Sequence, residues 1–424
     1  MTIAEKDKKY IWHPYTQMKD ALPVIPIVSA NKTLLHGEDG KTYIDAVSSW
    51  WTNIHGHAHP FISEQIYKQA KTAEHLIFAG FTHQPAVDLA ESLLQVLGSN
   101  QEKVFYSDNG STAVEVALKM AFQYWHNKGK EKRLVIAFEN AYHGDTFGAM
   151  SVSGRNAFTA PFQPFLFDVK TIPVPVAGKE EECMLSLKKI LHDHKNEIAS
   201  FIFEPLVQGT AGMIMYDAAT LDKLINLCRD EQILTIADEV MTGFGRTGKF
   251  FAGDYLRHKP DIFCFSKGIT GGFMPLGVTT CTNEIFDAFL SDQKSKTFFH
   301  GHSYTANPLA CAAALASLQL LCKKETTQQI KNIGQQHKHF AETTKAHKKW
   351  QDIRITGTIL AMNFSVSDQS YFSTIRDKMY TYFIQKGILL RPLGNILYIM
   401  PPYCISNEEL NYIYHHVLVF SHTR

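Results

Sequence analysis

Two residues that each follow a short apolar segment have the chemistry of a cofactor site. Asp238 comes directly after the apolar run 233–237, and Lys267 follows the run Phe-Cys-Phe-Ser at 263–266. Because reactive groups gather at the carboxyl ends of the strands of an α/β sheet, both side chains are expected to point into one crevice. A lysine amine forms a Schiff base with pyridoxal phosphate, and a carboxylate keeps the pyridine nitrogen protonated. The pair therefore predicts a pyridoxal phosphate site.

The alternative is a surface lysine and a strand-end acid that share this spacing by chance. Lys267 is followed by Gly-x-x-Gly-Gly at 268–272, and a lysine between a strand and such a glycine run is less common. Lysine also suits the task, because its pKa falls when it is desolvated or placed near positive charge. Both observations favour the cofactor site.

Two further segments have side chains that suit the same cofactor. A strand runs into Asp-Asn-Gly-Ser-Thr at 108–112 and a helix follows, so Gly110 and Ser111 lie where free N–H groups bind a phosphate. The alternative is an ordinary helix N-cap. Tyr142 and His143 lie in a loop after the apolar segment 134–138, and an aromatic ring there can stack on the cofactor or simply pack in the loop.

Two other motifs suggest different chemistry, and their context argues against it. Residues 243–248 match the Gly-x-Gly-x-x-Gly dinucleotide fingerprint, but no helix pattern follows and no acid stands about 20 positions on. His55, His57 and His59 alternate as zinc ligands can in an extended segment. No carboxylate or thiolate stands near them in the sequence, and the neighbouring Gly56 and Pro60 indicate a turn. We therefore expect neither a nucleotide nor a metal.

Short apolar strands separated by helices predict the α/β domain that must position these residues. The expected strands cover 103–106, 134–138, 200–203, 234–237, 262–265 and 276–280, and the expected helices cover 64–78, 86–97, 111–127 and 218–231. Such an alternation predicts a parallel or mixed sheet with both faces covered.

The C-terminal part predicts a second, smaller α/β domain. An alanine-rich helix is expected over 307–321, continuing in pieces to about Lys345. Strands over 357–364 and 397–400 and helices over 372–386 and 407–419 are expected after it, with early strands over 24–28, 33–36 and 42–45 packing against this part. The predicted division is an N-terminal segment 1–60, a large domain 61–307 and a small domain 308–424.

Composition excludes several classes of function. The formal net charge of +1 over 424 residues gives no attraction to nucleic acid or an anionic membrane. The seven cysteines contain no CxxC pair and lie in apolar segments, which indicates reduced thiols. No segment has the length of apolar sequence that a transmembrane helix needs, and the N-terminus is unlike a targeting peptide. We expect a cytoplasmic protein.

Together the motifs resemble those of the class III aminotransferases. The block Asp-Glu-x-x-x-Gly-x-Gly-Arg-x-Gly begins at Asp238, and Lys267 stands 29 positions after that residue. The resemblance covers essentially the whole chain and implies a pyridoxal-phosphate-dependent transferase of fold type I. In that fold, a large domain with a mixed, mostly parallel sheet is joined to a smaller α/β domain.

The resemblance narrows to the adenosylmethionine–8-amino-7-oxononanoate aminotransferases of biotin biosynthesis. The segments that carry it are WHPYTQM (12–18), SSWWTNIHGHAHP (48–60), NAYHGDTFGAMSV (140–152), FFHGHSYTANPLACAAAL (298–315) and LLRPLGNILYIMPPY (389–403). The first segment and the tryptophan pair are not general class III features. The implied reaction converts 8-amino-7-oxononanoate to 7,8-diaminononanoate with S-adenosylmethionine as amino donor.

The resemblance also implies a role for each matching residue. Lys267 is the Schiff-base lysine and the acid/base of the proton shift, and Asp238 pairs with the pyridine nitrogen. Gly110 and Ser111 bind the phosphate, and Tyr142 stacks on the ring.

Other roles depend on a homodimer or on the substrate. Ser303, with His302, reaches the phosphate from the other subunit of a homodimer with shared active sites. Tyr15, Trp50 and Gly301 line the substrate pocket with Tyr142, and Arg391 binds the carboxylate of the keto substrate.

Some features depart from the family pattern or leave the function open. His302-Ser303 replaces a frequent Pro-Thr, and Thr210 stands where relatives that use ornithine or γ-aminobutyrate have a glutamate. No residue decides between S-adenosylmethionine and lysine as donor. The alternatives are another class III aminotransferase using an amino acid or diamine, a pyridoxal-phosphate decarboxylase or aminomutase, and a non-enzymatic pyridoxal-binding regulator.

Overall fold

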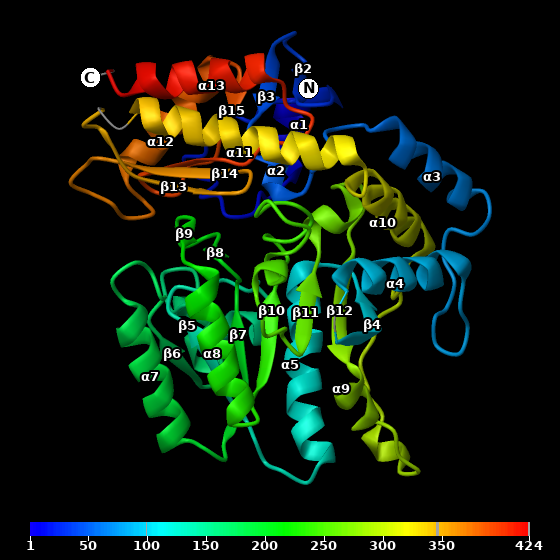
Figure 1. Ribbon diagram of the computed structural model, residues 1–424. Helices are drawn as coiled ribbons and strands as arrows, with labels where there is room; N and C mark the ends of the chain where they lie inside the picture. Colours follow the sequence, from blue (N-terminus) through cyan, green and yellow to red (C-terminus); the bar gives the residue numbers. More distant parts are fainter. Residues whose placement is uncertain (99, 345–346, 423–424) are drawn as a thin grey trace.

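A seven-stranded sheet forms the centre of the larger lobe in the computed structural model, which describes residues 1–98, 100–344 and 347–422 (Figure 1). The strand order is β4-β12-β11-β10-β7-β5-β6. The strands are β4 (Gln101–Ser107), β12 (Gly277–Thr282), β11 (Ile262–Phe265), β10 (Leu234–Asp238), β7 (Ile198–Phe203), β5 (Leu134–Phe138) and β6 (Val169–Ile172). Strand β12 pairs antiparallel with β4 and β11, and the other neighbouring strands of this sheet pair in parallel. The expected α/β class with a mixed, mostly parallel sheet is confirmed.

Helices cover both faces of this sheet because its strands are apolar on both faces. Val135 and Ala137 of β5 pack with helix α5, while Ile136 and Phe138 pack on the face covered by α4, α7 and α8. The helices of this lobe are α4 (Gln84–Leu97), α5 (Gly110–Asn127), α6 (Phe147–Ser151), α7 (Glu180–Asp193), α8 (Ala218–Asp230) and α9 (Asn283–Asp287). Alternate residues of one strand thus serve two apolar cores.

The second lobe combines the two ends of the chain. Strand β15 (Ile388–Leu389) pairs in parallel with β3 (Thr42–Asp45), which continues the antiparallel strands β2 (Leu34–Gly37) and β1 (Ile27–Asn31). A separate sheet joins β13 (Trp350–Thr356), β14 (Ile359–Phe364) and β16 (Ile396–Ile399). Its helices are α11 (Lys324–Thr344), α12 (Thr374–Gln385) and α13 (Asn407–Phe420). The division at residues 60 and 307 stays a prediction.

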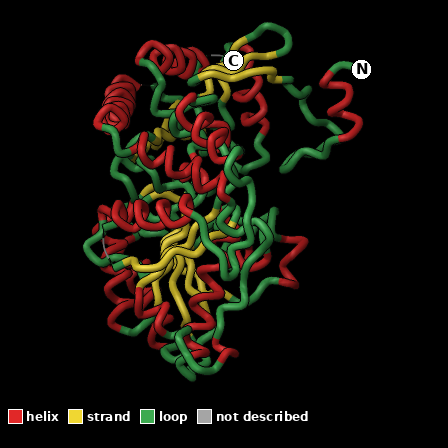
Figure 2. The backbone as a smooth tube through the Cα atoms, turned by 90° about the vertical axis from the view of Figure 1, so that its right-hand side faces the viewer, coloured by secondary structure: helices red, strands yellow, loops and turns green. Residues whose placement is uncertain are grey.

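The remaining elements are three longer helices and several short segments. Helix α10 (Pro308–Leu321) packs on α3 (Pro60–Ala70) and α4. Helix α1 (Ile3–Tyr10) has no buried residue and projects from the side of the molecule (Figure 2). The shorter elements are α2 (Ser48–Trp51), β8 (Val207–Gln208), β9 (Ile214–Met215) and the 3-10 helices η1 (Ala160–Phe165), η2 (Ala252–Tyr255), η3 (Lys267–Thr270) and η4 (Lys294–Lys296).

Two expected elements differ from those observed, and the end of a third falls outside the described residues. The helix expected over 64–78 ends at Ala70, and Leu76 and Ile77 beyond it are exposed, so their apolar character does not reflect packing within this chain. The strand expected over 24–28 begins only at Ile27, because Pro26 has no N–H to donate to a ladder. The expected end of the long helix at Lys345 lies outside the described residues.

Two other expectations concern the whole chain. All seven cysteines are free thiols, which confirms the expected absence of a disulfide framework. Among the described residues, no helix combines the length and apolar character needed to cross a bilayer.

Candidate active site

A cavity of about 300 Å³ lies where three parallel strands of the large sheet end. Strand β10 ends at Asp238, β11 is followed by Ser266 and Lys267, and β7 is followed by Glu204. All four of these residues line the cavity, together with Trp51, Asn109, Gly110, Ser111, Tyr142, His143, Gly144, Val240 and Met241. The carboxyl ends of the strands therefore bring one amine and two carboxyl groups to one place.

Lys267 is half-buried at the start of η3 and has a left-handed backbone, with φ of 49°. Its Nζ lies 4.5 Å from the centre of the Trp51 ring. Burial lowers the pKa of the lysine from its usual 10.5 to about 8, against the opposing effect of Asp238 and Glu204. A substantial fraction of the amine is therefore uncharged near neutral pH, as a nucleophile requires.

Asp238 is buried and held in place by two donors. Its Oδ2 lies 2.7 Å from His143 Nδ1, and its Oδ1 accepts the Val240 N–H at 3.0 Å. The His143 ring is completely buried, and its Nε2 has no hydrogen-bond partner among the described residues. His143 thus fixes the orientation of the Asp238 carboxylate at the cavity.

Glu204 holds the loop that brings Tyr142 and His143 to the cavity. Its two carboxyl oxygens accept the N–H groups of Tyr142, at 3.0 Å, and Gly209, at 2.9 Å. Burial raises its pKa from 4.5 to about 7, while His143 lowers it and Asp238 raises it. The carboxyl group is therefore divided between its charged and neutral forms near pH 7.

The start of α5 forms an opening that fits a phosphate. The N-cap Asn109 accepts the N–H of Thr112, and the Ser111 hydroxyl accepts the N–H of Asp145 at 3.1 Å. A Cβ at Gly110 would lie 2.7 Å from a Val240 methyl group, and one at Gly144 only 2.1 Å from Ser111 Oγ. Glycine at both positions lets the chains approach closely around the first N–H groups of the helix, which bind anions.

Two tyrosines share one carboxylate beside the cavity. The Tyr142 hydroxyl donates to Asp145 Oδ2 at 3.0 Å, and the Tyr15 hydroxyl donates to the same oxygen. The two hydroxyl oxygens are 3.1 Å apart. Burial, reinforced by Asp145, raises the pKa of Tyr15 from 10.0 to about 12, so the hydroxyl stays protonated. The N-terminal segment is thereby tied to the loop at Tyr142.

Aromatic rings extend this cluster toward Arg391. The Tyr15 ring lies 5.6 Å from Trp50 and 6.3 Å from Phe158, and the Arg391 guanidinium lies 4.3 Å from the centre of the Trp50 ring. Arg391 is exposed, and no described carboxylate lies within ion-pair distance of it. An apolar wall next to an unpaired guanidinium suits a chain that ends in a carboxylate.

The loop from Gly301 to Ser303 does not line the cavity of this chain. Gly301 and Ser303 are exposed, and the His302 N–H donates to Thr305 Oγ1 at 3.1 Å. The neighbouring Phe299 and Tyr304 are also exposed. The roles implied for Gly301, His302 and Ser303 therefore stay predictions that need a second copy of the chain.

Several residues of the site were not assigned a role from the sequence. Glu204 directly follows β7, so the strand-end rule that predicted Asp238 applies equally to it. Trp51 was noted only as part of the tryptophan pair, and Asp145 carries no signal in the sequence that separates it from other polar residues. Arg246 is fully buried, donates to the carbonyls of Pro401 and Trp51, and contributes to lowering the pKa of Lys267.

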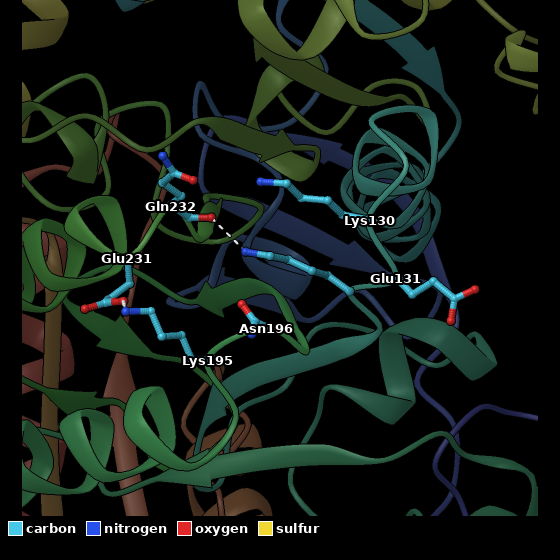
Figure 3. Close-up of a pocket in the computed structure, with 7 residues that line it drawn as sticks. Lys130, Glu131, Lys195, Asn196, Glu231 and Gln232 are labelled. Atoms are coloured by element: carbon cyan, nitrogen blue, oxygen red, sulfur yellow. Dashed lines mark hydrogen bonds and ion pairs between the residues drawn. The ribbon is translucent and has the colours of Figure 1, made fainter.

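A second cavity, of about 350 Å³, lies away from this site (Figure 3). It is formed by loops at the opposite ends of the strands, and Lys132 donates there to the carbonyl of Gln232 at 3.2 Å. Lys195 pairs with Glu231 at 3.4 Å. The cavity has no Asp–Lys pair at adjacent strand ends, so it does not offer the chemistry of the first.

The comparisons with known proteins agree with this geometry. The model of the family described as aminotransferase class-III matches residues 15–418. The chain belongs to the class III aminotransferases.

Its relatives define a narrower group. The adenosylmethionine-8-amino-7-oxononanoate aminotransferase of Synechococcus elongatus is 46% identical over 413 residues, which cover 96% of each chain. The enzyme of the same name from Helicobacter pylori is 38% identical over 96% of this chain and 95% of its own. The crystal structure of the enzyme of that name from Methanocaldococcus jannaschii superposes with a TM-score of 0.92 at 35% identity, covering 98% of both chains.

The depressed pKa of Lys267 predicts a measurable reactivity. In the cofactor-free protein, acylation of Lys267 by labelled acetic anhydride should reach half its maximal rate near pH 8, because only the free amine reacts. Peptide mapping by mass spectrometry measures the label at each pH. In Asp238→Asn the midpoint should fall further, since the lost carboxylate favours the charged amine. A wild-type midpoint at or above the usual 10.5 would contradict the burial argument.

Proposed function

We propose that this protein transfers an amino group from S-adenosylmethionine to 8-amino-7-oxononanoate, with pyridoxal 5′-phosphate as cofactor. The observation that carries the proposal is one cavity in which Lys267 and the buried Asp238 stand at adjacent strand ends, beside an aromatic wall that leads to Arg391. The names of the relatives and the five segments of the sequence resemblance support the choice of substrates.

The cofactor fits the polar groups that line the cavity. Gly110, Ser111 and the start of α5 would hold its phosphate, Asp238 its pyridine nitrogen and Lys267 its aldehyde carbon. When bound, pyridoxal phosphate supplies an electron-withdrawing ring that stabilises negative charge on the carbon next to the substrate nitrogen. The ring of Tyr142, fixed through its backbone N–H by Glu204, is available to stack on the cofactor.

Lys267 is the acid and base of the proposed reaction. Its free amine would accept the α proton of the amino donor at Nζ and pass it to the cofactor, and in the second half-reaction it would carry a proton from the cofactor to the carbonyl carbon of the acceptor. Partial burial beside the Trp51 ring lowers the pKa of this amine to about 8, which leaves part of it free to accept a proton. His143 holds Asp238 in the orientation that the ring nitrogen needs throughout both half-reactions.

The substrate wall suits a long aliphatic keto acid. Trp50 and Tyr15 cover methylene groups, at roughly 0.8 kcal/mol for each buried CH₂. Arg391 offers its planar fork to the terminal carboxylate, because no described side chain neutralises it. Thr210, in place of an acid, leaves this region without the extra carboxylate of relatives that use two acidic substrates.

A homodimer with shared active sites would complete the cavity. Exposed apolar side chains support a second copy as partner, namely Leu76, Ile77, Phe81, Phe299 and Tyr304. In that arrangement Gly301, His302 and Ser303 would reach the phosphate and substrate of the other chain. The free thiols of all seven cysteines support placement of the enzyme in the cytoplasm.

Spectroscopy of each half-reaction separately tests the proposed function. S-adenosylmethionine should bleach the visible band of the bound cofactor, and 8-amino-7-oxononanoate should restore it. Lysine, ornithine and alanine are tested alongside as donors. Bleaching by lysine alone would change the donor but keep the acceptor. Bleaching by ornithine or alanine only, with no recovery on adding the keto acid, would reject the proposal.

Arg391→Ala should separate the two substrates. The KM for 8-amino-7-oxononanoate should rise about 10- to 100-fold, as expected when a charge-assisted contact of roughly 1.5–3 kcal/mol is lost. The rate of bleaching by the donor should stay close to that of the wild type. Arg133→Ala, which removes an exposed arginine paired with Glu131, is the control. Equal losses in both half-reactions would show that Arg391 does not select the keto acid.

A further inference from the structure

The tryptophan pair lies on a turn with an unusual backbone. Ser48, Ser49 and Trp51 all have positive φ, at 51°, 58° and 70°. Side chains other than glycine rarely adopt this region, and such residues persist only where their surroundings hold them there. Helix α2, which contains them, is interrupted for the same reason. Some group must therefore fix this turn.

The group that fixes the turn is the carboxylate of Asp45. This residue is completely buried at the end of β3, and its Oδ1 accepts the N–H of Val47 at 3.1 Å. Its Oδ2 accepts the N–H of Ser49 at 2.7 Å and faces Nε2 of His57 at 2.8 Å. His57 belongs to the histidine motif of the sequence, and it thus contacts a carboxylate that stands twelve positions earlier.

Contacts from residues far away in the sequence hold the other side of the same turn. The Ser48 hydroxyl donates to the carbonyl of Met400 at 2.9 Å, and Arg246 donates to the carbonyl of Trp51 at 3.4 Å. The indole N–H of Trp51 donates to the Tyr398 hydroxyl at 3.0 Å. The turn is therefore clamped between Asp45 on one side and residues from distant parts of the chain on the other.

The clamped turn presents its two indoles to different parts of the site. Trp50 lies against Tyr15 and under the guanidinium of Arg391, in the substrate wall. Trp51 lies against the amine of Lys267 and lines the cavity. A change in the backbone between them would move both rings, because their directions are set by the same three left-handed residues.

We propose that Asp45 and His57 are positioning residues that set the places of Trp50 and Trp51, and through them the affinity for the keto substrate. His57 supplies the remaining side-chain contact, because its Nε2 donates to the Asp45 carboxylate, whose other hydrogen-bond partners are neutral. The other two histidines of the motif have different contacts. His55 faces Ser317 at 3.0 Å, and His59 Nδ1 has no partner among the described residues. The inference rests on the proposed function only where it names the keto substrate.

The experiment compares Asp45→Asn and His57→Leu with His57→Gln, which keeps a donor, and with His59→Gln as the matched control. The near-UV circular dichroism of the tryptophans should change in the first two variants and stay close to that of the wild type in the others. In Asp45→Asn and His57→Leu the KM for 8-amino-7-oxononanoate should rise at least about tenfold, with a smaller change in the rate at which the donor bleaches the cofactor band.

Each outcome decides for or against the proposal. Folded Asp45→Asn and His57→Leu proteins with an unchanged near-UV spectrum and unchanged KM would overturn it. If Asp45→Asn fails to fold, His57→Leu decides alone, because it removes one contact to the carboxylate and leaves those from the N–H groups of Val47 and Ser49. If the wild type does not use the keto acid, the proposed function fails, and the near-UV spectra still decide whether the pair positions the indoles.

Discussion

The site depends on one partly desolvated lysine amine that shares its cavity with two carboxyl groups. Withdrawing a charged amine from water is costly, and this desolvation lowers the pKa of Lys267 to about 8. Asp238 and Glu204 oppose the shift, and each carboxyl group is held by fixed donors. The amine is thus reactive because it is partly desolvated, and the cavity stays ordered because every oxygen of these two carboxyl groups has a partner.

The large sheet places these three groups. Strands β7, β10 and β11 are adjacent and parallel, so the residues that follow them, Glu204, Asp238 and Lys267, emerge at one edge. The mouth of the cavity is assembled differently, from segments far apart in the sequence. Trp50 meets Arg391 there, and Tyr15 meets Tyr142. The sheet positions the reactive groups, while segments near both ends of the chain form the proposed substrate wall.

The sequence predicted the parts of this arrangement that follow from local patterns. Asp238 and Lys267 were predicted as site residues because each follows an apolar segment. The burial of a strand and the place where it ends both follow from hydrophobicity. Several elements were not predicted, among them the strands β6, β13 and β15 and the helix α7. Strand β13, with the sequence Trp-Gln-Asp-Ile-Arg-Ile-Thr, contains charged residues, and only Trp350 in it is fully buried. The antiparallel direction of β12 also follows from long-range packing rather than from its residues.

Other features depend on contacts that no local pattern encodes. The apolar residues at 76 and 77 indicated a helix with a buried face, yet they are exposed, because periodicity does not distinguish a core from the surface of an assembly. The partnership of Asp45 with His57 and of Tyr15 with Asp145 joins segments that only the fold brings together. Glu204 is different, since it directly follows β7 and its place at a strand end could therefore be predicted from the sequence.

The central claim is that Lys267 binds the cofactor, and borohydride reduction of the holoenzyme tests it most directly. Reduction fixes pyridoxal phosphate to the lysine that holds it, and peptide mapping by mass spectrometry then locates the added mass. The account predicts a single modified peptide that contains Lys267, and no stable label in Lys267→Ala. A label on any other lysine of the wild-type protein, or none at all in protein that retains its visible band, would contradict it.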